Sequence, residues 1–263
     1  VYVPHDSVTI DESMVKFKGR LSFRQYLPSK PIKWDLKVWS LCESFSGCMA
    51  NFQVYTGKVP GRTEHGLGHR VVMDLTRHLH GSNIRLYMDN FYTGVPLLKS
   101  LRAHFILACG TIRPNSKGLP AELLPKNKAL KKHEFLVAKK NDLVYCSWMD
   151  TKPVLTLTNF HNPQARGVVN RRNKEDGKKH QVKIHRQLQD YQENMKGVDL
   201  CDQMVSHHLI QHRSKKWWRR LYFYLLLLQS MGVVSATQPK DHNPPPNYIT
   251  KHKSNSLNKY PYY

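Results

Sequence analysis

Aspartates in three short segments have the spacing and surroundings expected of a metal-dependent nuclease. Asp11 and Asp89 each follow a short apolar run of the kind that forms a β-strand. Both carboxylates should therefore lie at strand ends of a sheet, where several catalytic folds place their metal ligands. Asp199 and Asp202 are three residues apart, so a helix from Tyr191 onward would carry both on one face and could lean that face toward the strand ends. Carboxylates from distant parts of the chain could then share divalent cations.

The alternative for each aspartate is structural, because a single Asp at a strand end is more often a helix cap, a turn former or a salt-bridge partner. The scarcity of acids favours a site. The 263 residues include 41 Lys and Arg against 19 Asp and Glu, which gives a net charge of +22 and a pI near 9.9. In so basic a chain, acids that follow apolar runs and have few basic neighbours indicate a functional cluster.

Composition also limits the class of protein. With 40% hydrophobic and 10% aromatic residues, the chain can bury a sizeable core, as one large domain or as a domain that carries an insertion. The positive charge favours a polyanionic partner, and nucleic acid is the leading candidate. Ribosomal, histone-like and membrane-surface proteins share the charge but not the large core with strand-end carboxylates. Because the chain opens at Val1 on a strand pattern, we expect it to be part of something longer.

Cysteine and histidine spacing argues against a soft-metal site. The cysteines form an odd set without a CxxC pair, which disfavours a disulfide scaffold or a zinc ribbon: Cys42, Cys48, Cys109, Cys146 and Cys201. The pair His78/His80 and the group His207/His208/His212 could be drawn as ligands, but no Cys or Glu partner stands at zinc-like spacing. These histidines are interpreted as surface residues that face phosphate.

One apolar run, at residues 221–228, resembles a membrane segment. It is shorter than the roughly 20 apolar residues that a span needs, and Gln229 and Ser230 interrupt it. We therefore expect a buried core helix and no membrane association. No signal peptide precedes the first strand, so a reducing intracellular setting is expected.

Hydrophobic periodicity predicts an α/β domain interrupted by a β-rich segment. In the first part, Thr93 is a candidate helix cap and Pro96 falls in the first turn of the same helix. The expected elements in order are strands at 7–15, 32–42 and 48–56, a helix at 68–79, a strand at 84–88, a helix at 93–103 and a strand at 105–112. Residues 1–113 would then form the first part of a catalytic core, and residues 185–237 would form its C-terminal helices. Between them, residues 114–184 would form a basic β-rich insertion with strands at 134–138, 143–148 and 154–158. Residues 238–263 would form a polar, proline-rich tail.

Two basic stretches could contact DNA. The flank of the insertion is either a solvated loop or a strip that faces DNA, and its cations are Arg166, Arg171, Arg172, Lys174, Lys178, Lys179, Lys183 and Arg186. Residues 212–220 interleave cations with Trp217 and Trp218, which suits phosphate contact together with stacking on an unpaired base. The alternative is the start of an amphipathic helix with both indoles in the core. We expect a split, with one indole buried and one facing DNA.

Several short motifs together resemble the piggyBac transposase family, in the family's order and over nearly the whole chain. The motifs are residues 8–12 with 17–20, 26–31, 88–93, 110–115 and 196–204. The resemblance implies an RNase H-like mixed sheet flanked by helices, with a β-rich insertion before the last catalytic helix. It also implies cut-and-paste DNA transposition into TTAA sites, which takes place in the nucleus.

The same resemblance implies roles for individual residues. Asp11, Asp89 and Asp199 match the family's metal-binding triad, Asp202 matches a further required aspartate, and Trp217 falls in a basic, Trp-containing stretch near the transposon end. The implied cofactors are two Mg²⁺ or Mn²⁺ ions, and the implied partner is double-stranded DNA, bound by a homodimer of the full-length protein. The candidate DNA-binding residues are Arg113, Arg171, Arg172, Lys178, Lys179, Arg213, Lys215, Lys216 and Trp217.

Two departures from the family pattern bear on function. The family's N-terminal region and its C-terminal cysteine-rich zinc module are not seen here, so no zinc is expected and recognition of transposon ends is open. The sequence before Val198 has Lys196 where the family more often has a second glycine. The hypotheses are therefore a two-metal transposase, a domesticated DNA-binding protein that no longer cuts and, as a third choice, a structure-specific nuclease.

Overall fold

The computed structural model describes residues 3–26, 34–57, 66–120, 123, 130–172, 177–208 and 214–236. Within them, one large mixed sheet runs in the order β2-β3-β1-β5-β6-β9-β8-β7, with β4 paired to β3, and β10 and β11 form a separate two-stranded sheet. The strands are β1 (Ser7–Lys16), β2 (Gln25–Tyr26), β3 (Trp34–Glu43), β4 (Met49–Val54), β5 (Arg85–Met88), β6 (Leu107–Thr111), β7 (Phe135–Lys140), β8 (Leu143–Met149), β9 (Pro153–Thr158), β10 (Arg166–Arg172) and β11 (Lys179–His185). The helices are α1 (Leu67–Thr76), the 3-10 turn η1 (Arg77–Leu79), α2 (Val95–Ala103), α3 (Arg186–Asn194), α4 (Gly197–His207) and α5 (Trp217–Ala236).

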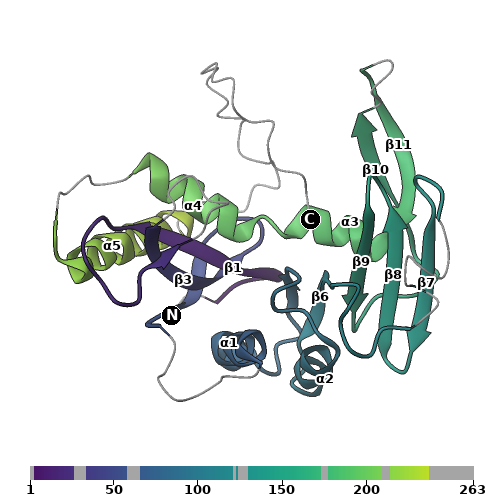
Figure 1. Ribbon diagram of the computed structural model, residues 1–263, viewed down its shortest axis with the longest axis horizontal. Coiled ribbons are helices and arrows are strands. Elements are labelled where there is room, and N and C mark those ends of the chain that lie inside the picture. The colour runs from purple at the N-terminus through teal and green to yellow at the C-terminus, as the bar shows by residue number, and fades with distance from the viewer. Residues whose placement is uncertain are drawn as a thin grey trace.

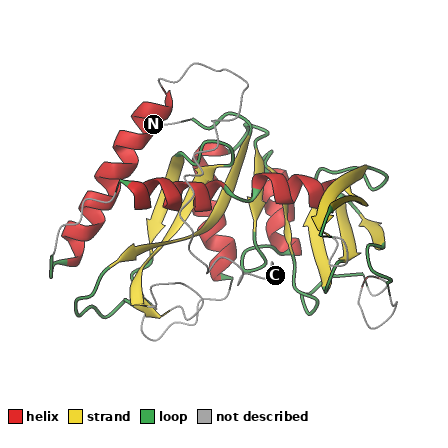
Figure 2. Ribbon diagram, turned by 90° about the horizontal axis from the view of Figure 1, so that it is seen from above, coloured by secondary structure: helices red, strands yellow, loops and turns green. Residues whose placement is uncertain are grey.

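The centre of the sheet is parallel and is covered on both faces. β5 runs parallel to both β1 and β6, whereas β3 and β9 flank these three strands in the antiparallel sense. A parallel sheet is stable when helices cover both of its faces. Here α1 and α2 lie on one side, and α3, α4 and α5 lie on the other (Figure 1). Seen from above, α4 and α3 follow one another across the sheet (Figure 2).

Alternation along β1 assigns its side chains to the two faces. Val8 and Ile10 belong to the large apolar core that includes α1 and α2. The residues between and beyond them face the other way: Thr9 Oγ1 donates to the carbonyl oxygen of Asn194 at the end of α3 (2.8 Å), and Val15 packs with Tyr224 of α5. Asp11 is in phase with Thr9 and Val15, so it lies on the face that α3, α4 and α5 cover.

The β-rich segment before α3 extends the main sheet. β9 pairs with β6 through Cys109↔Thr158 and Thr111↔Thr156, and β8 and β7 follow outward. This pairing covers the edge of β6 that would otherwise be open. Only β10 and β11, among the described strands, leave the sheet.

Most of the expected elements are present, with shifted ends. The C-terminal helices begin at Arg186, not near Tyr191, and α2 begins after Gly94, with Pro96 in its first turn. Thr93 does not cap α2, because its hydroxyl donates to the carbonyl oxygen of Asp89 (2.7 Å). The expected tail beyond residue 237 lies outside the described residues.

The long helix α5 is less buried than the apolar run predicted. Tyr224 lies in the core, but Tyr222 is 56% exposed and Leu226 is 39% exposed. The run is too long to fit on one buried stripe, so its other positions face outward. No helix in the described ranges has the length and apolar character to cross a membrane. All five cysteines are free and buried.

Candidate active site

The candidate catalytic carboxylates follow the last pair of two neighbouring parallel strands: Asp89 comes directly after β5, whereas Asp11 lies within β1, which continues to Lys16, and not at a strand end as expected. The last register pair of β1 and β5 is Ile10↔Met88, and the next residue on each strand is an aspartate, Asp11 and Asp89. Adjacent strands lie about 4.8 Å apart, so the two backbones bring these side chains to neighbouring positions. Ile10 and Met88 both face the core on the side of α1 and α2. By alternation, Asp11 and Asp89 point toward the layer of α3 and α4.

The environment of Tyr191 supports this orientation. Tyr191 lies in α3, and burial raises the pKa of its hydroxyl. The negative charges of Asp89 and Asp11 raise this pKa further. A tyrosine on α3 thus experiences both carboxylates at once. The two aspartates and α3 therefore form one site on this side of the sheet.

Local hydrogen bonds fix both carboxylates to the backbone. Asp11 Oδ1 accepts from the amide of Glu12 (2.8 Å), and Asp89 Oδ1 accepts from the amide of Phe91 (2.9 Å). The carbonyl oxygen of Asp89 accepts from the amide of Thr93 (3.1 Å). An aspartate that bonds the backbone two residues ahead forms a tight turn, so the segment after β5 is held closely.

The charges at this site are predominantly acidic. Burial raises the pKa of the Asp89 carboxyl, and the charge of Glu12 adds to the rise, whereas the Phe91 amide and Arg113 act in the opposite direction. Perturbed pKa values of this kind are common at functional sites. The carboxyl-rich donor set is also the type that hard, oxygen-seeking cations prefer.

Glu12 links the site to its surroundings. Its Oε1 accepts from Tyr92 Oη (3.0 Å) and from Lys37 Nζ (3.0 Å). Burial raises the pKa of Tyr92 far above its usual range, and the charges of Glu12 and Asp11 contribute. The network connects β1, β3 and the turn after β5, so it holds Asp11 and Asp89 in a fixed relation.

Helix α4 covers the same face of β1 and β3. Val198, Cys201 and Val205 are its buried residues, and Gly197 lies against the backbone at Glu43, where an added Cβ would be 2.7 Å from the carbonyl oxygen. The glycine therefore permits the close approach of the helix to β3. Asp199 is exposed on this helix.

Asp202 lies deeper than Asp199. It is half-buried, and its charge is among the causes that raise the pKa values of Cys42 and Tyr224, after burial and the effects of Cys201. Tyr224 also lies beside Ser13 of β1. Asp202 is thus near the middle of β1 and β3, and its position suits a residue that orients α4.

Within the described ranges, no group of three or more His, Cys, Asp or Glu side chains is arranged to hold a metal ion. The structure brings Asp11 and Asp89 to adjacent positions and places α4 over the same face. It does not bring Asp199 into a three-carboxylate group with them. Asp11 and Asp89 fit a divalent cation by chemistry and placement, whereas the described residues do not show the full convergence expected from the sequence.

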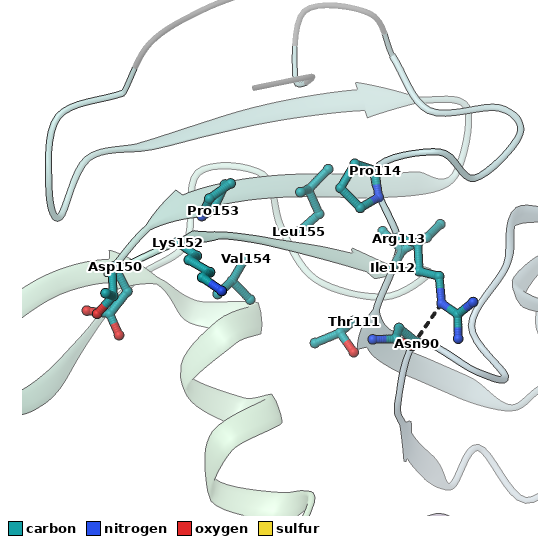
Figure 3. A pocket seen from close by; sticks show the side chains of 11 residues that line it. Asn90, Thr111, Ile112, Arg113, Pro114, Asp150, Lys152, Pro153, Val154 and Leu155 are labelled. Atoms are coloured by element: carbon teal, nitrogen blue, oxygen red, sulfur yellow. Dashed lines mark hydrogen bonds between the residues drawn. The ribbon is translucent and has the colours of Figure 1, made fainter. Parts of the chain in front are cut away.

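A pocket of about 380 Å³ is lined by Asn90, the residue that follows Asp89 in the chain (Figure 3). On one side lie Asn90 and Arg113, whose Nε donates to Asn90 Oδ1 (3.1 Å), and on the other lie Asp150 and Lys152 at the turn between β8 and β9. Arg113 is therefore next to the acidic site, where it could meet a phosphate.

The candidate basic residues on the insertion flank divide between two environments. Arg171 lies over the ring of Trp148 (5.2 Å to the centroid) and pairs with Asp150 (3.5 Å), so its contacts are within the protein, and its role in DNA binding stays a prediction. Arg172, Lys178 and Lys179 are exposed.

The tryptophans of the C-terminal basic stretch are split, but not as Trp217 was assigned. Trp217 packs edge-on against Phe23 (5.3 Å) and joins the core under α5. Trp218 is 50% exposed and lies between Lys216 and Arg219. The indole available for a base is therefore Trp218, which sequence reasoning missed. Lys215 and Lys216 are exposed, and Arg213 lies outside the described residues.

Comparison with known proteins gives the family. A family model described as transposase IS4 matches residues 1–231. The chain belongs to the transposase IS4 family. It is 29% identical over 227 residues to PiggyBac transposable element-derived protein 3 of Homo sapiens, an alignment that covers 82% of this chain and 38% of that protein. The human chimeric ERCC6-PGBD3 protein matches at the same identity and length, with 21% of its own length covered.

The solved structures confirm the fold. A piggyBac transposase in a cryo-EM structure of a synaptic complex with hairpin DNA matches with a TM-score of 0.69 and 23% identity, covering 98% of this chain and 61% of that one. The piggyBac resemblance and the mixed α/β fold class inferred from the motifs are thereby confirmed. The present chain spans less than two fifths of the length of these two human relatives, since its alignments cover 38% of one and 21% of the other.

Proposed function

We propose that this chain is the catalytic part of a piggyBac-like DNA transposase that cleaves and joins DNA strands with divalent metal ions. The observation that carries the proposal is the register of β1 and β5, which sets Asp11 and Asp89 side by side on adjacent parallel strands, under the helix layer that carries Asp199. Family membership supports the same reaction class.

Each residue of the site has its own proposed role. Asp11 and Asp89 would hold Mg²⁺ or Mn²⁺, and the family resemblance gives Asp199, which the structure does not bring to them, as the third ligand. Bound there, such ions would supply activation of a water or a DNA 3′-hydroxyl and stabilisation of the leaving oxygen. Glu12, through Tyr92 and Lys37, keeps the two strands in a fixed relation.

Other groups position the substrate and the helix. Arg113, beside Asp89, would hold a phosphate of the scissile strand, because guanidinium matches phosphate geometry. Asp202, half-buried against β1 and β3, would orient α4. The proposal also includes TTAA target sites and transposon ends on duplex DNA as substrates. It further includes a homodimer of the full-length protein and a location in the nucleus.

A domesticated DNA-binding protein that does not cut is the second candidate. The described residues hold no three-carboxylate metal group, and two of the human relatives are named as derived from a transposable element. The net charge of +22 serves either function, since both require DNA.

Nicking of a duplex with TTAA-flanked candidate ends separates the two candidates. The transposase proposal expects nicks with Mg²⁺ or Mn²⁺ and none in EDTA. Salt-dependent binding without nicks under any divalent ion would establish the non-cutting alternative. The Asp89→Asn chain should bind the same duplex and leave it intact, whereas equal nicking by this variant would exclude the carboxylate from the reaction.

A further inference from the structure

The two-stranded ribbon of β10 and β11 has two chemically different faces. Its antiparallel register pairs Val168 with Lys183, Asn170 with Gln181, and Arg172 with Lys179. Exposure alternates along β10, with Arg166, Val168, Asn170 and Arg172 outward. We define the outer face by the six residues Val168, Asn170, Arg172, Lys179, Gln181 and Lys183.

The inner face is part of the protein core. Val169 and Val182 pack with Ile184, Leu188 and Trp148. Arg171, also on this side, lies on the Trp148 ring and pairs with Asp150. The inner face therefore fixes the ribbon and leaves the outer face for another molecule.

The outer face is cationic at both ends and amidic between them. Lys183 lies next to Val168 near α3, Arg172 and Lys179 lie toward the tip, and Asn170 and Gln181 lie between. All six residues are exposed, Val168 by 46%. The described residues of the ribbon include no Asp or Glu. A polyanion is the complement of such a face.

The ribbon is mounted on the helix that reaches the candidate active site. Gln189 Oε1 of α3 accepts from the amide of Val168 (3.2 Å), and Gly167 allows α3 to approach β10 closely, since an added Cβ would lie 3.3 Å from Gln189 Cβ. Two residues further along α3, Tyr191 experiences the charges of Asp89 and Asp11. The ribbon projects beyond α3 at the end of the molecule away from α5 (Figure 1). DNA on the ribbon would thus be held by an element fixed to the catalytic layer.

We propose that the outer face enters the major groove of duplex DNA, with Asn170 and Gln181 reading base edges and Arg172, Lys179 and Lys183 on the flanking phosphates. The inference rests on the proposed function in that it takes DNA as the substrate. A two-stranded β-ribbon fits the major groove, which is about 12 Å wide, and Asn or Gln can bond adenine at both N6 and N7. Directly opposed residues of an antiparallel pair have Cβ atoms roughly 5 Å apart, which suits two neighbouring base pairs.

The test measures binding alone, in EDTA, so that it does not depend on cleavage. Fluorescence anisotropy of the chain on duplex DNA between about 50 and 200 mM salt gives the slope of log affinity against log salt. Replacing Arg172 and Lys179 together by alanine should weaken binding to all sequences and flatten that slope by about 1.8. The matched control is Arg171→Met, which removes a neighbouring charge on the inner face and keeps an unbranched side chain over Trp148; its slope should stay at the wild-type value.

The amide pair is tested by sequence preference. Selection from randomised duplexes should yield a preferred sequence for the wild type, and Asn170→Ala with Gln181→Ala should lower the discrimination by roughly 5- to 150-fold for each lost adenine contact, at an unchanged salt slope. Thermal melts of all variants check that they fold.

Several outcomes would overturn the ribbon proposal. The first is a wild type that has no affinity or no sequence preference for duplex DNA, and the second is stronger binding to an RNA duplex. The third is an equal change of the salt slope in Arg171→Met and in the Arg172 and Lys179 double variant. The fourth is an unchanged sequence preference in the Asn170 and Gln181 double variant. A wild type that binds with the expected preference but never nicks DNA would refute the proposed cleavage and support the ribbon's role.

Discussion

Alanine substitutions at Trp217 and Trp218 should separate the stability of the fold from DNA binding. Trp217 packs edge-on against Phe23 within the core cluster under α5, whereas Trp218 is 50% exposed between Lys216 and Arg219. Adjacent positions on a helix point about 100° apart, so two neighbouring indoles can have different roles. Trp217→Ala should destabilise the protein, and Trp218→Ala should weaken its hold on DNA.

The magnitudes follow from burial. A fully buried Trp→Ala change costs about 3–5 kcal/mol, and an edge-on aromatic pair contributes about 0.5–1.5 kcal/mol beyond its area. Trp217 is only partly buried, so we expect about 2–3 kcal/mol, or a fall in Tm of roughly 4–12 °C. Trp218 loses exposed cation–π contacts of about 0.5–1 kcal/mol each, part of which the better helix propensity of alanine offsets.

For DNA, loss of a stacking indole costs about 1–3 kcal/mol per base and leaves the salt slope unchanged. Thermal melts and urea titrations of both variants, with affinity for a duplex carrying unpaired bases measured across salt concentrations, give all the quantities needed. A Trp217→Ala chain that melts with the wild type, or a Trp218→Ala chain that loses as much stability as Trp217→Ala, would refute the assignment of the two rings.

Three further changes probe the site. The raised pKa of Asp89 means that the folded chain binds the proton more tightly than the unfolded chain, so ionisation of this carboxyl lowers the free energy of unfolding as pH rises above about 3.8. The gain in Tm from Asp89→Asn should therefore be larger at pH 8 than at pH 4.5. A gain that is independent of pH would contradict the burial of this charge. Tyr92→Phe removes a hydrogen bond to the Glu12 carboxylate and should cost roughly 1.5–3 kcal/mol in urea unfolding, where an unchanged midpoint would exclude the network. Gly110→Ala would place a Cβ 2.5 Å from the carbonyl oxygen of Met88, so it should cost about 1–3 kcal/mol and displace the end of β5, and a variant with wild-type stability and nicking would disprove this close packing.

Much of the part of the chain that carries Asp11 and Asp89 could be predicted because its signals are local. Apolar runs that end at Asp11 and Asp89 are typical of buried parallel strands, and both aspartates follow the last residue pair of β1 and β5, although Asp11 itself lies inside β1. The helix spacing at residues 68–79 likewise matches α1 and η1. The two neighbouring carboxylates could be found from sequence because one residue type and one pattern coincide, whereas only Asp89 lies at a strand end.

The remaining features depend on contacts between distant segments. Whether Arg171 or Arg172 faces outward depends on which face of β10 meets Trp148, and a stretch of consecutive basic residues does not reveal that phase. Trp217 and Trp218 are equally apolar, so only the packing of α5 on Phe23 distinguishes them. The position of Asp199 depends on how α4 lies over β1, which spacing within the helix does not determine.

The alternation of apolar and polar residues along β1 also does not predict the contacts of Glu12. Alternation places it on the face opposite to Asp11, yet its carboxylate meets Tyr92 from the turn after β5 and Lys37 from β3. The only sequence signal was an acid directly after Asp11 in a chain with few acids.

The central claim is that Asp11 takes part in metal-dependent cleavage of DNA, and single-turnover nicking of a TTAA-flanked duplex in Mg²⁺ tests it most directly. Asp74→Asn is the matched control, since Asp74 lies on α1 and pairs with Arg70 and Arg77 at the surface. We predict that the wild type and Asp74→Asn nick the duplex at similar rates. Asp11→Asn should bind it with equal or higher affinity and lose more than the roughly 10–100-fold that a change outside the coordination shell costs. Nicking by Asp11→Asn at the wild-type rate would contradict the claim.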